Sequence, residues 1–291
     1  RKKTLSNVFS STLSVKYNIS EEELLNAQAN YVKNVGRNIR MGNEDQEDIA
    51  AMRAVTGERG SEIAAQYDAL GISLSSTADR VGKMFSEASK NGLSFEKYSE
   101  NVSKNIKLAQ NYTFKNGTKG LEDMAKKATA IKMDMQQIAQ FADKIGTVET
   151  SIETSAKLQV LGGPFAQLAD PMGMLNEGLN DMEGLQDRIT KMVGSLGHFD
   201  KTTGEVTMSS FNKRRVKAAA EATGISYDAL MDTAFAQARR GEIEKQINSS
   251  TNAQGLSEEM RELIKNSGKI EKGKAGVTID GKFKSIDELT N

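Results

Sequence analysis

The chain has 291 residues, and 39 Lys and Arg balance 39 Asp and Glu, so its formal net charge at neutral pH is zero. This balance excludes a protein that binds DNA along its whole surface, because such binding needs a surplus of cations that release counterions. Cysteine is absent and histidine occurs once, which excludes disulfides, thiolate metal sites, cysteine nucleophiles and metal sites built on paired histidines.

The apolar composition predicts a mainly α-helical protein. Aromatic residues make up only 5% of the chain and Trp is absent, so the core must consist mostly of Ala, Leu, Ile, Val and the 13 Met. Only two prolines are present, so helices are rarely interrupted. No apolar run approaches the roughly 20 residues that a membrane-spanning helix needs. We therefore expect a fold of several helices without a membrane span.

The first recurring pattern is an apolar residue followed by Ser at the start of a helix. It follows Gly four times and Asn once, in Ile19-Ser20, Ile72-Ser73, Leu93-Ser94, Ile225-Ser226 and Leu256-Ser257. Gly and Asn adopt the left-handed conformation that ends a helix, and Ser caps the free amides of the next one. Ser20 with Glu23 predicts a complete capping box. The pattern predicts helices with very short connections that pack side by side as bundles.

Helical periodicity fills the segments between these corners, including 20–40, 73–90 and 94–112. The longest stripe alternates by three and four residues, through Leu121, Met124, Ala128, Ile131, Met135, Ile138, Ala142 and Ile145. This spacing predicts one long helix over about 120–160, as part of a bundle or of a self-associating coiled coil. We favour the bundle helix.

Glycine and proline change the pattern from Leu161 onward. Pro164 and Pro171 predict turns, and the apolar periodicity of 172–197 predicts a helix that breaks near Gly184. These features suggest a division into a helical region 1–160, a punctuated helical segment 161–200 and a hairpin with short helices in 201–291.

Two short β-hairpins are predicted near 199–208 and 277–284. The first has Thr203-Gly204 at its tip, and the second has Asp280-Gly281, a pair that suits a two-residue type I′ turn. A second capping box, Ser285 with Glu288, begins a helix just before the sequence ends. Because the sequence also starts without Met, we expect residues 1–291 to be a segment of a longer polypeptide.

Several residues and runs could mark a site. His198 lies between a predicted helix and hairpin without an adjacent carboxylate pair, so we interpret it as a loop residue. The four carboxylates of 43–48 lack the spacing and the central glycine of an EF-hand, so they predict a helix start and no calcium loop. The glycine-rich runs 57–60 and 273–276 match no phosphate-binding motif and predict turns.

The basic clusters are 213–217 and Arg239-Arg240. They could form a phosphate-binding patch, or a solvated face that pairs with carboxylates. We favour the second interpretation, because stacking aromatic residues are missing and three carboxylates lie close in the sequence: Glu221, Glu242 and Glu244. The sequence therefore predicts no catalytic, cofactor-binding or metal-binding residues, and we expect that the chain is not an enzyme.

Residues 131–247 resemble large tape-measure-like virion proteins of tailed bacteriophages, in particular the tail-lumen or cargo proteins of crAss-like phages. The resemblance rests on the runs 137–144, 157–166, 170–172, 178–185, 187–188 and 218–226 (QIAQFADK, KLQVLGGPFA, DPM, GLNDMEGL, DR and AAAEATGIS). It covers under half of the chain. One departure is that many tape-measure proteins contain long apolar spans, whereas this chain has none.

The resemblance implies a long, mainly helical protein packaged in the lumen of the phage tail or barrel and ejected with the genome into the host cell. It implies no catalytic residues and no small-molecule substrate. The expected partners are other virion proteins of the tail, barrel or portal-proximal region and further copies of the chain, with incidental proximity to DNA. The alternatives are a segment of a virion-associated cell-wall-degrading enzyme and a bacterial helical adaptor or export protein.

Overall fold

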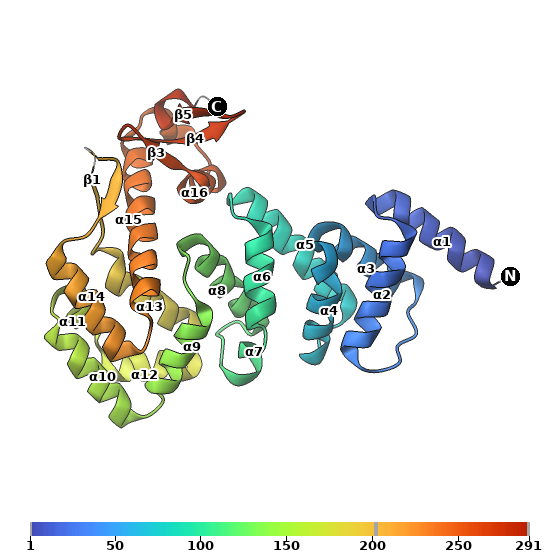
Figure 1. Ribbon diagram of the computed structural model, residues 1–291, viewed down its shortest axis with the longest axis horizontal. Helices are drawn as coiled ribbons and strands as arrows, with labels where there is room; N and C mark the ends of the chain where they lie inside the picture. The colour runs from blue at the N-terminus through green and yellow to red at the C-terminus, as the bar shows by residue number, and fades with distance from the viewer. Residues whose placement is uncertain (1, 201–202, 290–291) are drawn as a thin grey trace. The chain divides into compact units, whose positions relative to one another are not determined.

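A computed structural model describes residues 2–200 and 203–289, and its fold is mainly helical with a few short antiparallel strands (Figure 1). The predicted fold class is confirmed at this level. Within the described part of the chain, no helix is both long enough and apolar enough to cross a bilayer.

The chain divides into two compact units, one formed by residues 1–87 and 95–110 and the other by 88–94 and 111–291. We call them the first and the second unit. The boundary between them falls inside the predicted region 1–160. The division into 1–160, 161–200 and 201–291 was drawn from composition and stays a prediction.

In the first unit, the described residues form helices and their connections, without strands. The helices are α1 (Lys2–Tyr17), α2 (Glu21–Val35), α3 (Asn43–Thr56), the 3₁₀ helix η1 (Gly57–Arg59), α4 (Gly60–Ala69), most of α5 (Leu74–Lys90), α6 (Phe95–Asn105) and most of α7 (Leu108–Asn111). Tyr67, Tyr98 and Ile63 are among its fully buried side chains. The Ser61 hydroxyl on α4 donates to the carbonyl of Ala27 on α2 at 2.7 Å, which ties two packed helices together.

The predicted helix corners are confirmed. Four of the serines accept a hydrogen bond from the backbone N–H three residues later, at 3.1 or 3.2 Å: Ser20, Ser73, Ser226 and Ser257. The residue before the apolar one is left-handed at four corners: Asn18, Gly71, Gly92 and Gly224. At the fifth corner a 3₁₀ helix, η2 (Asn252–Gly255), takes the place of the left-handed residue. Local chain chemistry therefore sets where these helices end and begin.

The second unit contains most of the remaining helices. They are α8 (Thr118–Ile131), α9 (Met135–Lys144), α10 (Val148–Val160), α11 (Gly163–Leu168), α12 (Pro171–Asn180), α13 (Met182–Gly194), α14 (Ser210–Thr223), α15 (Tyr227–Ser249), α16 (Glu258–Ser267) and the 3₁₀ helix η3 (Ile286–Glu288). The 23-residue helix α15 packs against α13, α14 and α16. A small sheet lies at the C-terminal end of α15 (Figure 1), where its apolar residues share a core with Ile243 and Ile247.

The prediction of one long helix over about 120–160 is wrong, because α8, α9 and α10 fill this range. Lys132 is left-handed and the Asp134 carboxylate caps the amide of Gln136 at 2.9 Å, which ends α8 and starts α9. Thr147 caps α10 in the same way through the amide of Thr150. All eight residues of the predicted stripe are nevertheless buried. Asp and Thr compete with the helix by bonding to nearby backbone. The stripe is therefore divided between α8 and α9, with Ile145 at the C-cap of α9.

The turns predicted around the two prolines are confirmed. Pro171 is the first residue of α12, and the Asp170 carboxylate caps that helix. The helix predicted over 172–197 breaks at Asp181, whose carboxylate caps α13 by accepting from the amide of Gly184 at 3.0 Å. Gly178 marks a close approach, because a Cβ there would lie 3.4 Å from Ile145, the C-cap residue of α9.

Both predicted hairpins are confirmed. Strands β1 (His198–Asp200) and β2 (Glu205–Thr207) form the first, with Phe199 opposite Val206. Strands β4 (Lys274–Ile279) and β5 (Lys282–Ser285) form the second, and Asp280 and Gly281 both have the positive φ of a type I′ turn. The sequence analysis did not predict a third strand, β3 (Lys269–Glu271), which pairs with the first half of β4.

Candidate functional site

The structure places the single histidine on a surface strand. His198 is the first residue of β1, it is exposed, and Thr207 lies opposite it in the hairpin. Its carbonyl accepts a hydrogen bond from the Thr207 hydroxyl at 3.5 Å. His198 therefore begins a strand pair rather than lying in the predicted loop.

The acidic run 43–48 forms the first turns of α3, as predicted. The Asp45 carboxylate accepts a hydrogen bond from the amide of Gly42 at 2.8 Å, so it caps the helix start. Burial and the neighbouring carboxylates raise the pKa of Asp48, with burial as the larger cause. The acidic side chains lie at the N-terminus of α3, where the positive end of the helix dipole favours carboxylates.

The run 57–60 forms the 3₁₀ helix η1 and the first residue of α4, so the predicted turn is confirmed there. The turn predicted over 273–276 is wrong for three of its four residues, because only Gly273 lies in a turn and residues 274–276 belong to β4.

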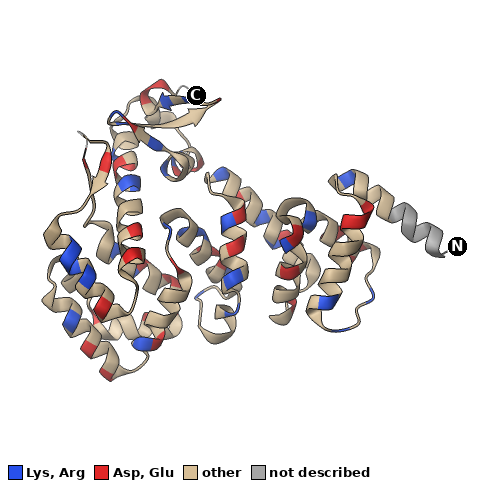
Figure 2. Cartoon of the chain, in the orientation of Figure 1, with Lys and Arg blue, Asp and Glu red and all other residues tan. Residues whose placement is uncertain are grey.

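The basic cluster 213–217 lies on α14, where Figure 2 shows two adjacent groups of cationic residues. Arg215 points into the second unit and donates to the carbonyls of Leu161, at 2.7 Å, and Gly162. Its guanidinium also lies over the rings of Phe165 and Phe211, at 5.2 and 5.5 Å. Arg215 therefore joins the end of α10 to α14, and the exposed cations of the cluster are Lys213, Arg214 and Lys217.

The second basic cluster contributes an internal ion pair. Arg240 on α15 lies 3.4 Å from Glu262 on α16, and both side chains are largely buried. Burial lowers the pKa of the Arg240 guanidinium, against the opposing effect of Glu262. Lys265 pairs with Glu262 and also with Glu244, at 3.3 Å to the latter. Arg240 thus pairs with a carboxylate, as predicted, but its partner is Glu262 and the pair is largely buried, whereas the prediction was a solvated face. These ion pairs join α16 to α15.

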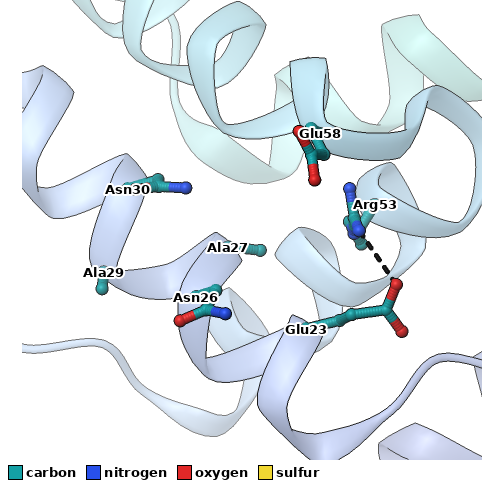
Figure 3. A pocket seen from close by; sticks show the side chains of 7 residues that line it. All are labelled: Glu23, Asn26, Ala27, Ala29, Asn30, Arg53 and Glu58. Atoms are coloured by element: carbon teal, nitrogen blue, oxygen red, sulfur yellow. Dashed lines mark hydrogen bonds and ion pairs between the residues drawn. The ribbon is translucent and has the colours of Figure 1, made fainter.

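A polar pocket of about 230 Å³ lies in the first unit between α2, α3 and η1 (Figure 3). Arg53 from α3 lies between the carboxylates of Glu23 and Glu58 and pairs with Glu23 at 3.0 Å. Asn26 and Asn30, one helical turn apart on α2, also line the pocket. Its amides and charges can bind water or a small polar molecule by hydrogen bonds.

Glu23 has two structural roles at this pocket. Its carboxylate accepts from the amide and the hydroxyl of Ser20, both at 2.9 Å, and it also pairs with Arg53. These hydrogen bonds hold the pKa of Glu23 below its ordinary value, and the Ser20 amide is the largest cause. The sequence predicted the capping box, but it gave no indication of Arg53 or Glu58. A contact across 30 residues leaves no local pattern that could have revealed it.

In the described part of the chain, no three His, Asp or Glu side chains are grouped so that they could hold a metal ion. The residues singled out from the sequence are spread over several elements: His198 on β1, Asp45 on α3, Arg215 on α14 and Arg240 on α15. The structure therefore brings none of them together as one site. Comparison with protein-family models, with curated proteins and with solved structures finds no match to this chain.

Proposed function

We propose that this chain is a structural or cargo component of a tailed-phage virion, similar in role to tape-measure proteins. On this proposal it occupies the tail or barrel lumen and is delivered with the genome. Its partners are other virion proteins of the tail, barrel or portal-proximal region and further copies of the chain. The resemblance of residues 131–247 supports the proposal, and these residues span α9 to most of α15.

The observation that carries the proposal is that the helices begin at N-caps, whose hydrogen bonds join residues only three apart in the sequence. At six N-caps a Ser or Thr hydroxyl accepts a hydrogen bond of 3.1 or 3.2 Å, from the amides of Glu23, Ser76, Thr150, Asn212, Ala229 and Met260. A protein that passes through a narrow tube must unfold and refold, and contacts close in sequence form fastest. Short, locally capped helices in small bundles suit that passage.

The composition of the core supports the same proposal. Met124, Met135, Met174, Met182 and Met192 are almost fully buried in the second unit. Methionine side chains are unbranched and adapt to irregular spaces, so a core rich in them can repack after disruption. The sequence contains no cysteine, so no disulfide opposes unfolding.

The direct test is to find the chain in purified particles. We expect peptides that cover residues 2–289 in the mass spectrum of gradient-purified virions, and labelled antibody fragments against the chain to decorate particles whose tails have been opened. An antibody against the capsid protein serves as the positive control. Absence of the chain from purified particles would refute the proposal.

Two further experiments test refolding and distinguish the structural role from that of a cell-wall-degrading enzyme. We expect the chain to refold from urea within seconds, because its helix boundaries depend on local contacts. In a zymogram on cell-wall substrate we expect no cleared band, with lysozyme as the positive control. A band that disappears when one carboxylate is changed to its amide would favour the cell-wall enzyme instead.

A further inference from the structure

An apolar cavity of about 550 Å³ lies in the second unit between α16 and β4. Its volume falls in the range of pockets that bind small molecules or peptide side chains. Met260 and Leu263 from α16 line one side, and Val277, Thr278 and Ile279 from β4 line the other. We call it the β4-edge cavity.

The second half of β4 has a neighbouring strand on one side only. Strand β3 pairs with residues 274–276 of β4, whereas β5 pairs with residues 276–279. The chain turns from α16 into β3 at Gly268, so β3 begins too late to reach Thr278. The cavity lies where a longer β3 would continue.

The hairpin register fixes the direction of the backbone groups at this edge. Ile279 and Lys282 flank the two-residue turn, so they form a hydrogen-bonded pair. In an antiparallel ladder such pairs alternate with non-bonded ones, which makes Thr278 and Phe283 a non-bonded pair. The N–H and C=O of Thr278 therefore point away from β5, toward the side that β3 does not cover.

The lining of the cavity agrees with this direction. Side chains alternate between the two faces of a strand, yet three consecutive residues of β4 contact the cavity. Among the described residues, none of β5 belongs to its lining. The cavity thus follows the edge of β4 and is not confined to one face of the sheet.

The described rim of the cavity is apolar apart from one cation. Met260 and Ile279 are 44% and 39% exposed, so both are accessible to a bound segment. Lys269 is the one charged residue among the described lining residues.

We propose that the β4-edge cavity binds an extended segment of a partner protein, which adds to β4 as a strand beside Thr278. Backbone hydrogen bonds to Thr278 orient the segment, and its alternate apolar side chains enter the cavity between Met260 and Ile279. An acidic residue at its end faces Lys269, by charge complementarity.

Fluorescence anisotropy with three synthetic peptides on the full chain tests this proposal. The probes are fluorescein-labelled DITITIE, its basic counterpart KITITIK and its polar counterpart DSTSTSE. We expect DITITIE to bind at least about tenfold more tightly than KITITIK, and DSTSTSE to show no binding. Lack of DITITIE binding would refute the proposal, as would equal affinity for the two charged peptides.

Substitutions at the rim test whether the peptide binds at the cavity. Met260→Glu adds a carboxylate at the rim, and we expect it to weaken DITITIE binding at least about tenfold. The matched control is Met172→Glu on α12, because Met172 is 57% exposed and lies outside the cavity lining. Ile279→Glu gives a second change at the rim should Met260→Glu prove unstable. Equal binding by the rim and control variants would overturn the assignment.

Hydrogen exchange separates strand addition from other modes of binding. Saturating DITITIE should slow exchange of the Thr278 amide at least about tenfold, because that N–H gains a partner. Binding without this protection would contradict strand addition. Self-association that Met260→Glu abolishes would identify a second copy of the chain as the occupant and overturn the peptide proposal.

Discussion

Arg188 on α13 donates two hydrogen bonds to the Glu177 carboxylate on α12, from Nε at 2.5 Å and from Nη2 at 2.7 Å. Its Nη1 donates to the carbonyl of Leu168 at the end of α11, at 2.6 Å. The two side chains are 14% and 21% exposed, and the bonds to Glu177 raise the pKa of Arg188. One guanidinium therefore connects three helices that follow one another around Pro171.

We expect Arg188→Met to lower the free energy of unfolding by about 2 kcal/mol, because it leaves the Glu177 carboxylate and the Leu168 carbonyl without these partners in a largely buried place. Urea denaturation followed by circular dichroism measures this change. The control is Lys157→Met, which breaks an exposed pair with Glu153 on α10 and should have no measurable effect. Equal losses in the two variants would show that the Arg188 pair has no special role.

The helix corners could be predicted because their causes are local. A Ser at the N-cap and a left-handed Gly or Asn before it depend on neighbours within a few residues, and the structure has both. The long helix was predicted wrongly for a related reason. The stripe from Leu121 to Ile145 describes burial, and buried positions keep their spacing when a capping residue such as Asp134 interrupts the helix.

The contacts that position the candidate sites could not be predicted, because they join distant parts of the chain. Arg53 lies 30 residues from Glu23, and Arg215 lies more than 50 residues from the carbonyls that it binds. A single sequence shows the charge of Arg215 but not how far its side chain is buried. The sequence therefore could not show that this member of the basic cluster makes a structural contact. Strand β3 was missed because its turn to β4 is Lys272-Gly273, which lacks the Asp-Gly signature of the second hairpin, and the run 273–276 was interpreted as a turn alone.

The Ser20 capping box predicts a specific pH dependence. The carboxyl of Glu23 has a pKa below 4.5 in the folded chain. Its stabilising effect is therefore complete above the unfolded value of 4.5 and is lost as the pH falls through the lower folded value. We expect Glu23→Gln to flatten the acid part of the curve of unfolding free energy against pH, measured by urea denaturation between about pH 3 and pH 7.

Ser20→Ala is the matched control for this effect. It removes the hydroxyl contact but keeps the backbone amide, which is the largest cause of the lowered pKa. We expect the pKa of Glu23, followed by NMR of its side-chain carboxyl, to rise only part of the way toward 4.5 in this variant. Identical acid profiles for wild type and Glu23→Gln would contradict the role given to this carboxylate.

Tyr112 provides a test at alkaline pH. Its hydroxyl donates to the Asp143 carboxylate on α9 at 2.8 Å, and burial together with this contact raises the pKa of Tyr112 to about 12. The neutral phenol is favoured in the folded chain, so its contribution to stability is complete below pH 10 and is lost as the pH rises through about 12. We expect absorbance at the tyrosinate band to lose the contribution of one phenol that ionises near pH 12 in Tyr112→Phe.

Asp143→Asn should lower the pKa of Tyr112 without restoring its ordinary value, because burial is the larger cause. Asp123→Asn on α8 is the control, since Asp123 pairs with Lys119 and Lys126 rather than with Tyr112. An unchanged late ionisation in Asp143→Asn would show that the hydrogen bond does not affect the phenol.

Gly178 tests how closely α12 and α9 pack. A Cβ at this position would lie 3.4 Å from Cδ1 of Ile145 and 3.5 Å from Cα of Ala142, which is ordinary van der Waals contact. Because a methyl group fits and Ala favours a helix interior over Gly, we expect Gly178→Ala to raise the free energy of unfolding by about 0.5–1 kcal/mol. Gly178→Leu overfills the same contact and should lower it by about 1–3 kcal/mol. Urea denaturation of both variants measures the free energy of unfolding. A loss of stability in Gly178→Ala would mean that even a methyl group forces α12 away from α9.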